Sequence, residues 1–217
     1  MAELRDVVDG RPGEWMQTFS GRKFFPLDPR PEDIYVSDIA NALAMTCRYG
    51  GHMPTGRFYS VAEHSVLMFR HGLAASQNMI EIEYEHNSQI YAHAAVVALF
   101  HDAAEAYTGD LPRAVKQAVK ESWAPVEARI EAAVWTHLQL EKEVVLHWEM
   151  VKEWDQRIVP AERAAFMRRE EVWAYDVLEP LPVNIRCLAP ISAKHAFVLA
   201  YWEACTIMGW DPEEIEL

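Results

Sequence analysis

One stretch, AVVALFHDAAEAYTGDLP at residues 95–112, constrains this chain more than any other. Its apolar start predicts a long buried helix over residues 88–107. Glu105 follows Asp102 by three residues and His101 by four. On a helix, all three side chains would therefore meet on one patch. Burying an ionised carboxylate costs several kcal/mol unless it is paired. The stretch therefore predicts either a helix end that emerges into solvent or a site that holds a cation.

Two further segments favour the cation. In SVAEHS, Ser60 and Glu63 have the spacing of a capping box, which places His64 near the start of a helix that we expect to close at Gly72. Asp155 lies in VKEWDQRIVPAERAAFM, within another predicted helix. Two histidines and two aspartates from three helices are a nitrogen and oxygen donor set that suits Mn²⁺, Co²⁺, Ni²⁺ or Mg²⁺.

Helical spacings of apolar residues recur through most of the chain, so we expect an all-α fold of about seven helices. We expect a leader with a short hairpin at residues 1–36, packed on a single helical domain at residues 37–217. The hairpin would come from KFFPLDPRPEDIYV, residues 23–36, although three prolines disfavour paired strands there. The tryptophans, which recur at helical spacings, are expected in the core or at an interface.

Charge and hydropathy exclude some classes of partner. The chain has 20 basic and 33 acidic residues and a formal net charge of −13, and such a surface repels phosphate backbones. No apolar run reaches the roughly 20 residues that span a bilayer. The N-terminus, MAELRDVVDGRPGEW, lacks the features of a signal peptide. We therefore expect a cytoplasmic protein that binds neither nucleic acid nor a membrane.

The order of these motifs resembles that of the HD-domain metal-dependent phosphohydrolase superfamily. The chain is most similar to the branch of bacterial 5′-deoxynucleotidases and their phage-borne deoxynucleoside-triphosphatase relatives. The blocks CRYGG, YSVAEHSVLM and LFHDAAEAYTGDLPRAVK carry the resemblance together with Asp155, over about residues 37–170. HDAAEAYTGDLP is the most specific block, because HDxxE followed by TGD(L/M)P is characteristic of that branch.

The resemblance implies a role for each matching residue. One divalent metal ion, which could be Co, Mn, Ni, Mg, Zn or Fe, would be held by His64, His101, Asp102 and Asp155. Glu105 would orient or deprotonate the attacking water, and Asp110 would act as a general acid or base or contact the substrate. Arg48 would contact the phosphate. Tyr49 would pack on the sugar or base, where family members often carry tryptophan or phenylalanine.

Four other residues are singled out by position alone. His52 lies in a glycine-flanked loop beside Arg48, and Lys116 follows the TGDLP turn, so both are candidate substrate contacts. His86 and His93 precede His101 at spacings of seven and eight residues, so all three could lie near one face. They are either partly exposed polar positions or, for His93 above all, part of the wall of the site.

The expected function is hydrolysis of nucleotides by a metal-activated water, most of all removal of the 5′-phosphate from deoxynucleoside monophosphates. One alternative is a dNTP triphosphohydrolase that releases tripolyphosphate, which would need more cationic contacts. Another is a non-catalytic ligand-sensing domain with a structural metal. The resemblance also implies a homodimer.

Overall fold

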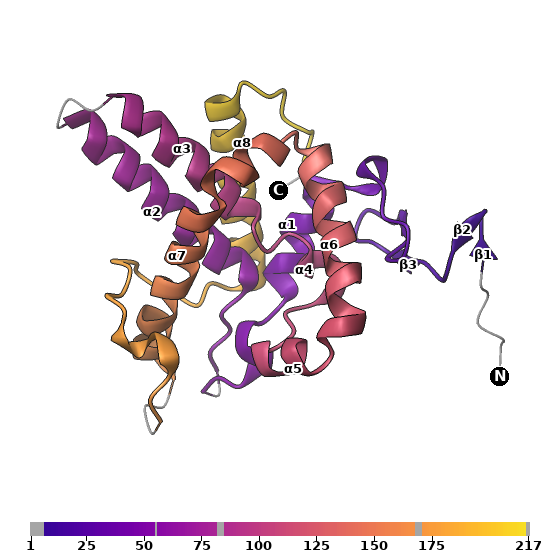
Figure 1. The fold of residues 1–217 in the computed structure, drawn as a ribbon, viewed down its shortest axis with the longest axis horizontal. Helices are drawn as coiled ribbons and strands as arrows, with labels where there is room; N and C mark the ends of the chain where they lie inside the picture. Colours follow the sequence, from indigo (N-terminus) through magenta and orange to yellow (C-terminus); the bar gives the residue numbers. More distant parts are fainter. Residues whose placement is uncertain (1–6, 55, 82–84, 168–170, 216–217) are drawn as a thin grey trace.

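The computed structural model describes residues 7–54, 56–81, 85–167 and 171–215. Within these ranges most residues are helical, which confirms the all-α prediction (Figure 1). The α-helices are α1 (Val36–Met45), α2 (Val61–Glu81), α3 (Glu85–Phe100), α4 (Glu105–Thr108), α5 (Arg113–Ala118), α6 (Lys120–His137), α7 (Glu141–Phe166) and α8 (Pro190–Met208). The 3₁₀ helices are η1 (Pro31–Asp33), η2 (Arg48–Gly51) and η3 (Ala174–Val177).

Two very short hairpins precede the helices. Strands β1 (Val7–Val8) and β2 (Arg11–Pro12) form one, and β3 (Met16–Gln17) and β4 (Lys23–Phe24) form the other. Figure 1 shows β1 and β2 projecting from the helical body. An N-terminal hairpin is thus confirmed, but its position within residues 23–36 is wrong. Prolines lack the N–H that a paired strand must donate, and the chain turns into η1 instead.

Helix α2 continues through Gly72 to Glu81, so the predicted end at Gly72 is wrong. A Cβ atom at residue 72 would lie 2.7 Å from the Cβ of Ala95 and 2.9 Å from the ring of Trp154. Gly72 is therefore needed because α2 approaches α3 and α7 closely at this point. It does not end the helix.

Only half of the predicted capping box forms at the start of α2. The Ser60 hydroxyl accepts the N–H of Glu63 at 3.1 Å, as a capping residue does. The Glu63 carboxylate does not turn back to the helix start. It accepts three N–H groups of the loop before α8, those of Arg186, Cys187 and Leu188.

Helix α3 ends at Phe100, seven residues before the predicted end. The next residues form turns, in which the N–H of Ala103 donates to Phe100 and that of Glu105 to Asp102, both at 2.9 Å. Such bonds between residues three apart are tighter than those of an α-helix. His101 and Asp102 therefore lie on a turn at the end of α3, and α4 begins only at Glu105.

The end of α3 is fixed by its surroundings. Residues 94–100 are fully buried, as their apolar run predicts, and α3 packs against α2, α7 and α8. The Phe100 ring meets Phe197 and Tyr201 of α8 edge-on. Because the interior is close-packed, the side chains at the end of α3 have little freedom to move, and the position at which the turn of His101 begins is fixed. Among the described helices, none combines the length and the apolar character that crossing a bilayer requires.

Candidate metal centre

Four side chains from three elements converge at the end of α3. His64 comes from the first turn of α2, His101 and Asp102 from the turn after α3, and Asp155 from the middle of α7. Nε2 of His64 lies 3.3 Å from Nε2 of His101 and 3.4 Å from Oδ1 of Asp155. Nε2 of His101 lies 3.2 Å from Oδ2 of Asp102. The structure thus brings together the four residues expected to hold the metal.

The hydrogen bonds of the two imidazoles show why a cation fits there. Nδ1 of His101 lies 2.7 Å from the carbonyl oxygen of Ala98, which can only accept, so this nitrogen carries the proton. Nδ1 of His64 lies 2.8 Å from Oε1 of Glu162 and donates to it in the same way. Both Nε2 lone pairs therefore face each other and two carboxylates.

Four acceptors without a donor between them attract a positive charge. Burial lowers the pKa of His101, but the Asp102 carboxylate outweighs it and raises that pKa to about 9. These acceptors thus favour a positive charge among them. A divalent ion supplies the missing positive charge better, and the donor set of two imidazoles and two carboxylates suits one. The residues present fit the metal that the sequence leads us to expect.

Glu105 lies beside this centre with one oxygen unpaired. Oε1 is 3.2 Å from Nζ of Lys116, which is also 2.8 Å from Glu127 of α6. Oε2 is buried and has no hydrogen-bond partner. Burial, together with the charges of Asp102 and Asp110, raises the pKa of Glu105 well above its usual 4.5. This carboxylate is therefore ready to hold a proton.

Arg48 and Tyr49 reach the centre from η2. The Arg48 guanidinium lies 3.4 Å from Oδ2 of Asp102, in contact with a candidate ligand. Tyr49 adopts a left-handed backbone conformation with φ 59°. Its N–H donates to Oδ2 of Asp110 at 3.1 Å, which ties η2 to the turn after α4.

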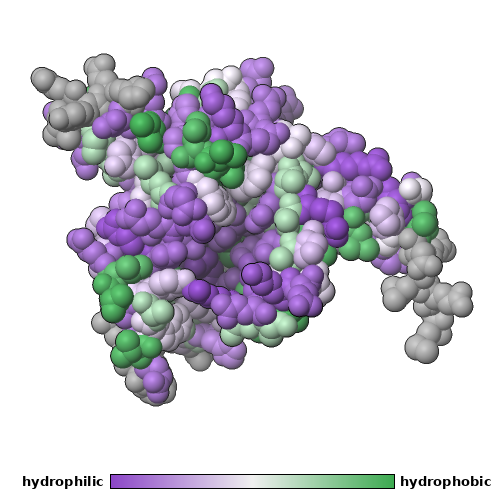
Figure 2. Space-filling view, viewed as in Figure 1, coloured by the Kyte–Doolittle hydropathy of each residue, from purple (hydrophilic) through white to green (hydrophobic). Residues whose placement is uncertain are grey.

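A cavity of about 490 Å³ opens beside this centre, and Asp102 and Asp155 are part of its lining. Seven of the ten predicted site residues line it, namely Arg48, Tyr49, Asp102, Glu105, Asp110, Lys116 and Asp155. His64 and His101 are buried next to these residues, whereas His52 is exposed and is not among the lining residues. A smaller cavity of about 230 Å³ reaches His101 from the α6 side. Figure 2 shows the surface hollowed between α6 and α7, with a mostly hydrophilic rim.

A comparison with known families matches residues 39–165 to one described as 5′-deoxynucleotidase YfbR-like. The chain belongs to the YfbR-like 5′-deoxynucleotidase family. The match covers more than half of the chain and confirms the resemblance drawn from HDAAEAYTGDLP. The family lies within the HD-domain superfamily, whose members generally bind a divalent metal.

Two curated relatives are similar over the same part. An uncharacterized protein of Rhodobacter capsulatus is 36% identical over 132 residues, which is 61% of each chain. The uncharacterized protein YfdR of Escherichia coli strain K12 is 32% identical over 120 residues, 55% of this chain and 56% of its own. This chain thus aligns with less than two thirds of the length of either relative.

Glu162, which the sequence did not single out, lies within the YfbR-like segment and organises the centre. It is fully buried on α7 and accepts hydrogen bonds from the hydroxyls of Tyr49 and Tyr59 as well as from His64. Arg48 Nε lies 3.3 Å from its Oε1. Glu162 follows Asp155 by seven residues, two turns of one helix face, and this spacing was the only signal in the sequence.

Trp173 and Tyr175 complete the cavity from outside the YfbR-like segment. They lie on a short loop and η3, so Trp173 is not in the core, one of the two places expected for the tryptophans. The Trp173 ring centroid is 6.0 Å from that of Tyr49. Leu111, Pro112 and Val159 line the cavity together with these rings, and we call this apolar part of the lining the apolar wall.

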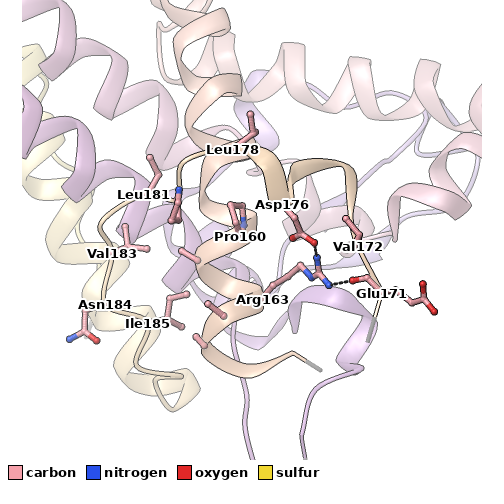
Figure 3. A pocket seen from close by; sticks show the side chains of 14 residues that line it. Pro160, Arg163, Glu171, Val172, Asp176, Leu178, Leu181, Val183, Asn184 and Ile185 are labelled. Atoms are coloured by element: carbon pink, nitrogen blue, oxygen red, sulfur yellow. Dashed lines mark hydrogen bonds and ion pairs between the residues drawn. The ribbon is translucent and has the colours of Figure 1, made fainter. Parts of the chain in front are cut away.

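A larger cavity of about 720 Å³ lies between the C-terminal half of α7 and residues 171–185 (Figure 3). Its Arg163 pairs with Asp176 and donates to the carbonyl oxygen of Glu171. Arg163 also stacks under Trp173, with Cζ 4.2 Å from the ring centroid. Among the described residues, no group with metal-ligating geometry lines this cavity. Arg163 thus supports Trp173, which lines the first cavity. The larger cavity is not our candidate site.

Two other histidines are singled out in the sequence, His86 and His93. His93 lies on α3 two turns before the centre, pairs with Glu143 at 3.0 Å, and is not among the residues lining the cavity. The side chain of His86 lies outside the described residues.

Proposed function

We propose that this protein is a divalent-metal-dependent phosphohydrolase that removes the 5′-phosphate from deoxynucleoside monophosphates. The observation that carries the proposal is the convergence of four acceptor atoms beside a cavity that Arg48 and Glu105 also line. Family membership supports the reaction class. A structural metal site would have no use for a buried, unpaired Glu105 oxygen, which argues against a ligand-sensing domain.

His64, His101, Asp102 and Asp155 would hold the ion. When bound, it would neutralise phosphate charge and lower the pKa of a water molecule. In the reaction, the water oxygen forms a new bond to phosphorus, the bond from phosphorus to the 5′ oxygen breaks, and the leaving oxygen takes up a proton.

Each chain residue has a task in this scheme. The Arg48 guanidinium offers paired N–H donors to phosphate oxygens. Glu105, with its raised pKa, accepts the proton that the water loses. Asp110 accepts the backbone N–H of Tyr49 and lines the cavity. From there it can act as a general acid or base at the leaving oxygen. Glu162 fixes Arg48 and His64 without touching the substrate.

The apolar wall would seat the nucleobase. A cavity of about 490 Å³ is within the range of about 300–1,000 Å³ that holds small ligands. Tyr49, Trp173 and Tyr175 offer faces on which a base stacks, and such stacking tolerates every base. Stacking therefore supports a nucleotide without selecting among bases.

Charge favours a monophosphate over a triphosphate. Of the described basic side chains, Arg48, Arg113 and Lys116 line the cavity. Arg48 and Lys116 already face carboxylates. A triphosphate would also need His52 and Arg57, and neither lines the cavity.

The test is phosphate release from a panel of nucleotides by protein loaded with Co²⁺ or Mn²⁺. We expect release from deoxynucleoside monophosphates and its loss in Asp102→Ala. Chromatography of the product from a dNTP separates phosphate from tripolyphosphate. If metal-loaded protein releases phosphate from no nucleotide, the proposal is wrong.

A second measurement tests the nucleobase seat. We expect Trp173→Ala to slow hydrolysis of a deoxynucleoside monophosphate but to leave deoxyribose 5-phosphate, which has no base, unchanged. Equal loss for both would show that Trp173 only supports the fold. The homodimer and the cytoplasmic location stay predictions, and light scattering on the purified protein would check the former.

A further inference from the structure

A second group of metal-ligating side chains lies outside the candidate metal centre. Glu143 and His147 are one turn apart on α7, and His93 lies on α3. Nδ1 of His93 is 3.0 Å and Nε2 of His147 is 3.2 Å from the same oxygen of Glu143, Oε2. The two nitrogens and the oxygen all lie within 4.8 Å of one another, so one ion could contact all three.

Both groups lie along the same two helices: α3 carries His93 and ends just before His101, and α7 carries Glu143, His147 and Asp155. His93 precedes His101 by eight residues, and His147 precedes Asp155 by eight residues. Eight residues of helix span about 12 Å, so this trio is too far from the candidate metal centre to share its ion. It is a separate site on the same pair of helices.

The trio is partly enclosed, and apolar residues pack at neighbouring positions of both helices. The side chains of His147 and Glu143 are 9% and 13% exposed, and that of His93 is 33% exposed, which leaves a way in for an ion. Val97, one turn after His93, is fully buried, and Val144 packs against the core.

We propose that His93, Glu143 and His147 form a second divalent-metal site, one that clamps α3 to α7. Two imidazole nitrogens and one carboxylate oxygen suit Zn²⁺, with water in the fourth position, or Co²⁺ and Ni²⁺. Mg²⁺ and Ca²⁺ prefer oxygen ligands and fit less well. Because α3 leads into His101 and α7 carries Asp155, the clamp would hold both helices that lead to the candidate metal centre.

The experiment measures zinc bound per chain. The full-length protein is stripped with a chelator and dialysed against Zn²⁺, and bound zinc is measured by mass spectrometry. We expect two equivalents for the wild type and one for His147→Gln. The double variant Asp102→Ala and Asp155→Ala removes the candidate metal centre, and we expect it to bind one equivalent of zinc. The triple variant that adds His147→Gln should bind no zinc.

Two further variants keep the test decisive. Glu143→Gln replaces the shared ligand if His147→Gln does not fold, as judged by circular dichroism. Glu149→Gln removes the same charge from the same helix at an exposed position and should leave two equivalents.

The outcomes separate this proposal from the proposed function. If neither His147→Gln nor Glu143→Gln lowers the zinc content, or if the wild type binds none, the trio is only hydrogen-bonded and the inference is wrong. If these variants lose one equivalent while the Asp102 and Asp155 variant loses none, the inference stands and the proposed function fails.

Discussion

Two buried glutamates lie beside the candidate metal centre, and their neighbours give them opposite proton affinities. Glu162 is 0% exposed, and although burial acts to raise its pKa, Arg48 and His64 hold it at about 2. Glu105 is 6% exposed, and burial together with Asp102 raises its pKa well above 4.5. Burial penalises both charges alike, so neighbouring donors and charges decide the outcome. The first carboxylate suits a structural task, and the second suits proton transfer.

The largest effect should come from Glu162→Gln. An amide cannot balance Arg48, and its NH₂ would face groups that also donate. Removing one partner of a buried ion pair costs about 3–5 kcal/mol, and we expect a loss near 3 kcal/mol in the free energy of unfolding. Urea denaturation measures it. The exposed Glu149→Gln on the same helix should change stability by less than about 0.5 kcal/mol, and an equal loss in both would refute the structural role of Glu162.

Glu105→Gln should separate activity from stability. A neutral amide removes the repulsion from Asp102 and Asp110, so we expect the free energy of unfolding to change by less than about 1 kcal/mol. Losing a general base typically lowers kcat by roughly 10²–10⁴-fold. Phosphate release at saturating substrate measures this, with bound metal as the control. Full activity in this variant would exclude Glu105 as the base.

The stability of metal-free protein should depend on pH in opposite ways for the two residues. The pKa of Glu162 is lower in the folded state than in the unfolded state. Its contribution to the free energy of unfolding is therefore present above about pH 4.5 and is lost as the pH falls toward about 2. The stability difference between wild type and Glu162→Gln should therefore shrink on acidification. The pKa of Glu105 is higher in the folded state than in the unfolded state. Its contribution to the free energy of unfolding is therefore present below about pH 4.5 and is lost as the pH rises through the pKa of the folded state.

Urea denaturation of chelator-treated proteins between neutral pH and about pH 3 checks both trends. Parallel curves for the two variants would contradict the difference between the two glutamates.

The smallest effect should come from Lys116→Met. Lys116 lowers the pKa of Glu105, so removing it should raise that pKa further. A base must be deprotonated to act, so the acidic limb of the kcat profile should move to higher pH. We expect less than about a tenfold change in kcat at neutral pH. Lys120→Met, an exposed position two residues beyond the end of α5, is the control and should leave the profile in place.

Much of the fold could be predicted from local pattern. The apolar run at 94–100 is buried, and Ser60 caps α2. The errors came from information that is not local. Gly72 resembles a helix end, but it is needed because Ala95 and Trp154 lie too close for a Cβ atom. Helix α3 stops at Phe100, where the N–H groups of Ala103 and Glu105 donate to residues three positions earlier.

The site shows the same division. His101 and Asp102 are conspicuous because they follow an apolar run, which makes a polar pair unusual. Glu162 is one of 33 acidic residues, on a helix rich in glutamate, and only the fold shows that four donors surround it. Trp173 carries no local sign that it faces a cavity, because its neighbour Tyr49 is more than a hundred residues away in the chain.

The loop that bears Trp173 has a consequence for how such proteins diverge. The candidate metal ligands, Glu105 and Arg48 all fall within residues 39–165, whereas Trp173 and Tyr175 fall beyond them. In our proposal, the residues that act in hydrolysis lie in one stretch of the chain together with Tyr49, and the other two rings that stack on the base lie beyond it. A short exchange around residues 171–178 would retune the choice of substrate and leave the hydrolytic machinery untouched.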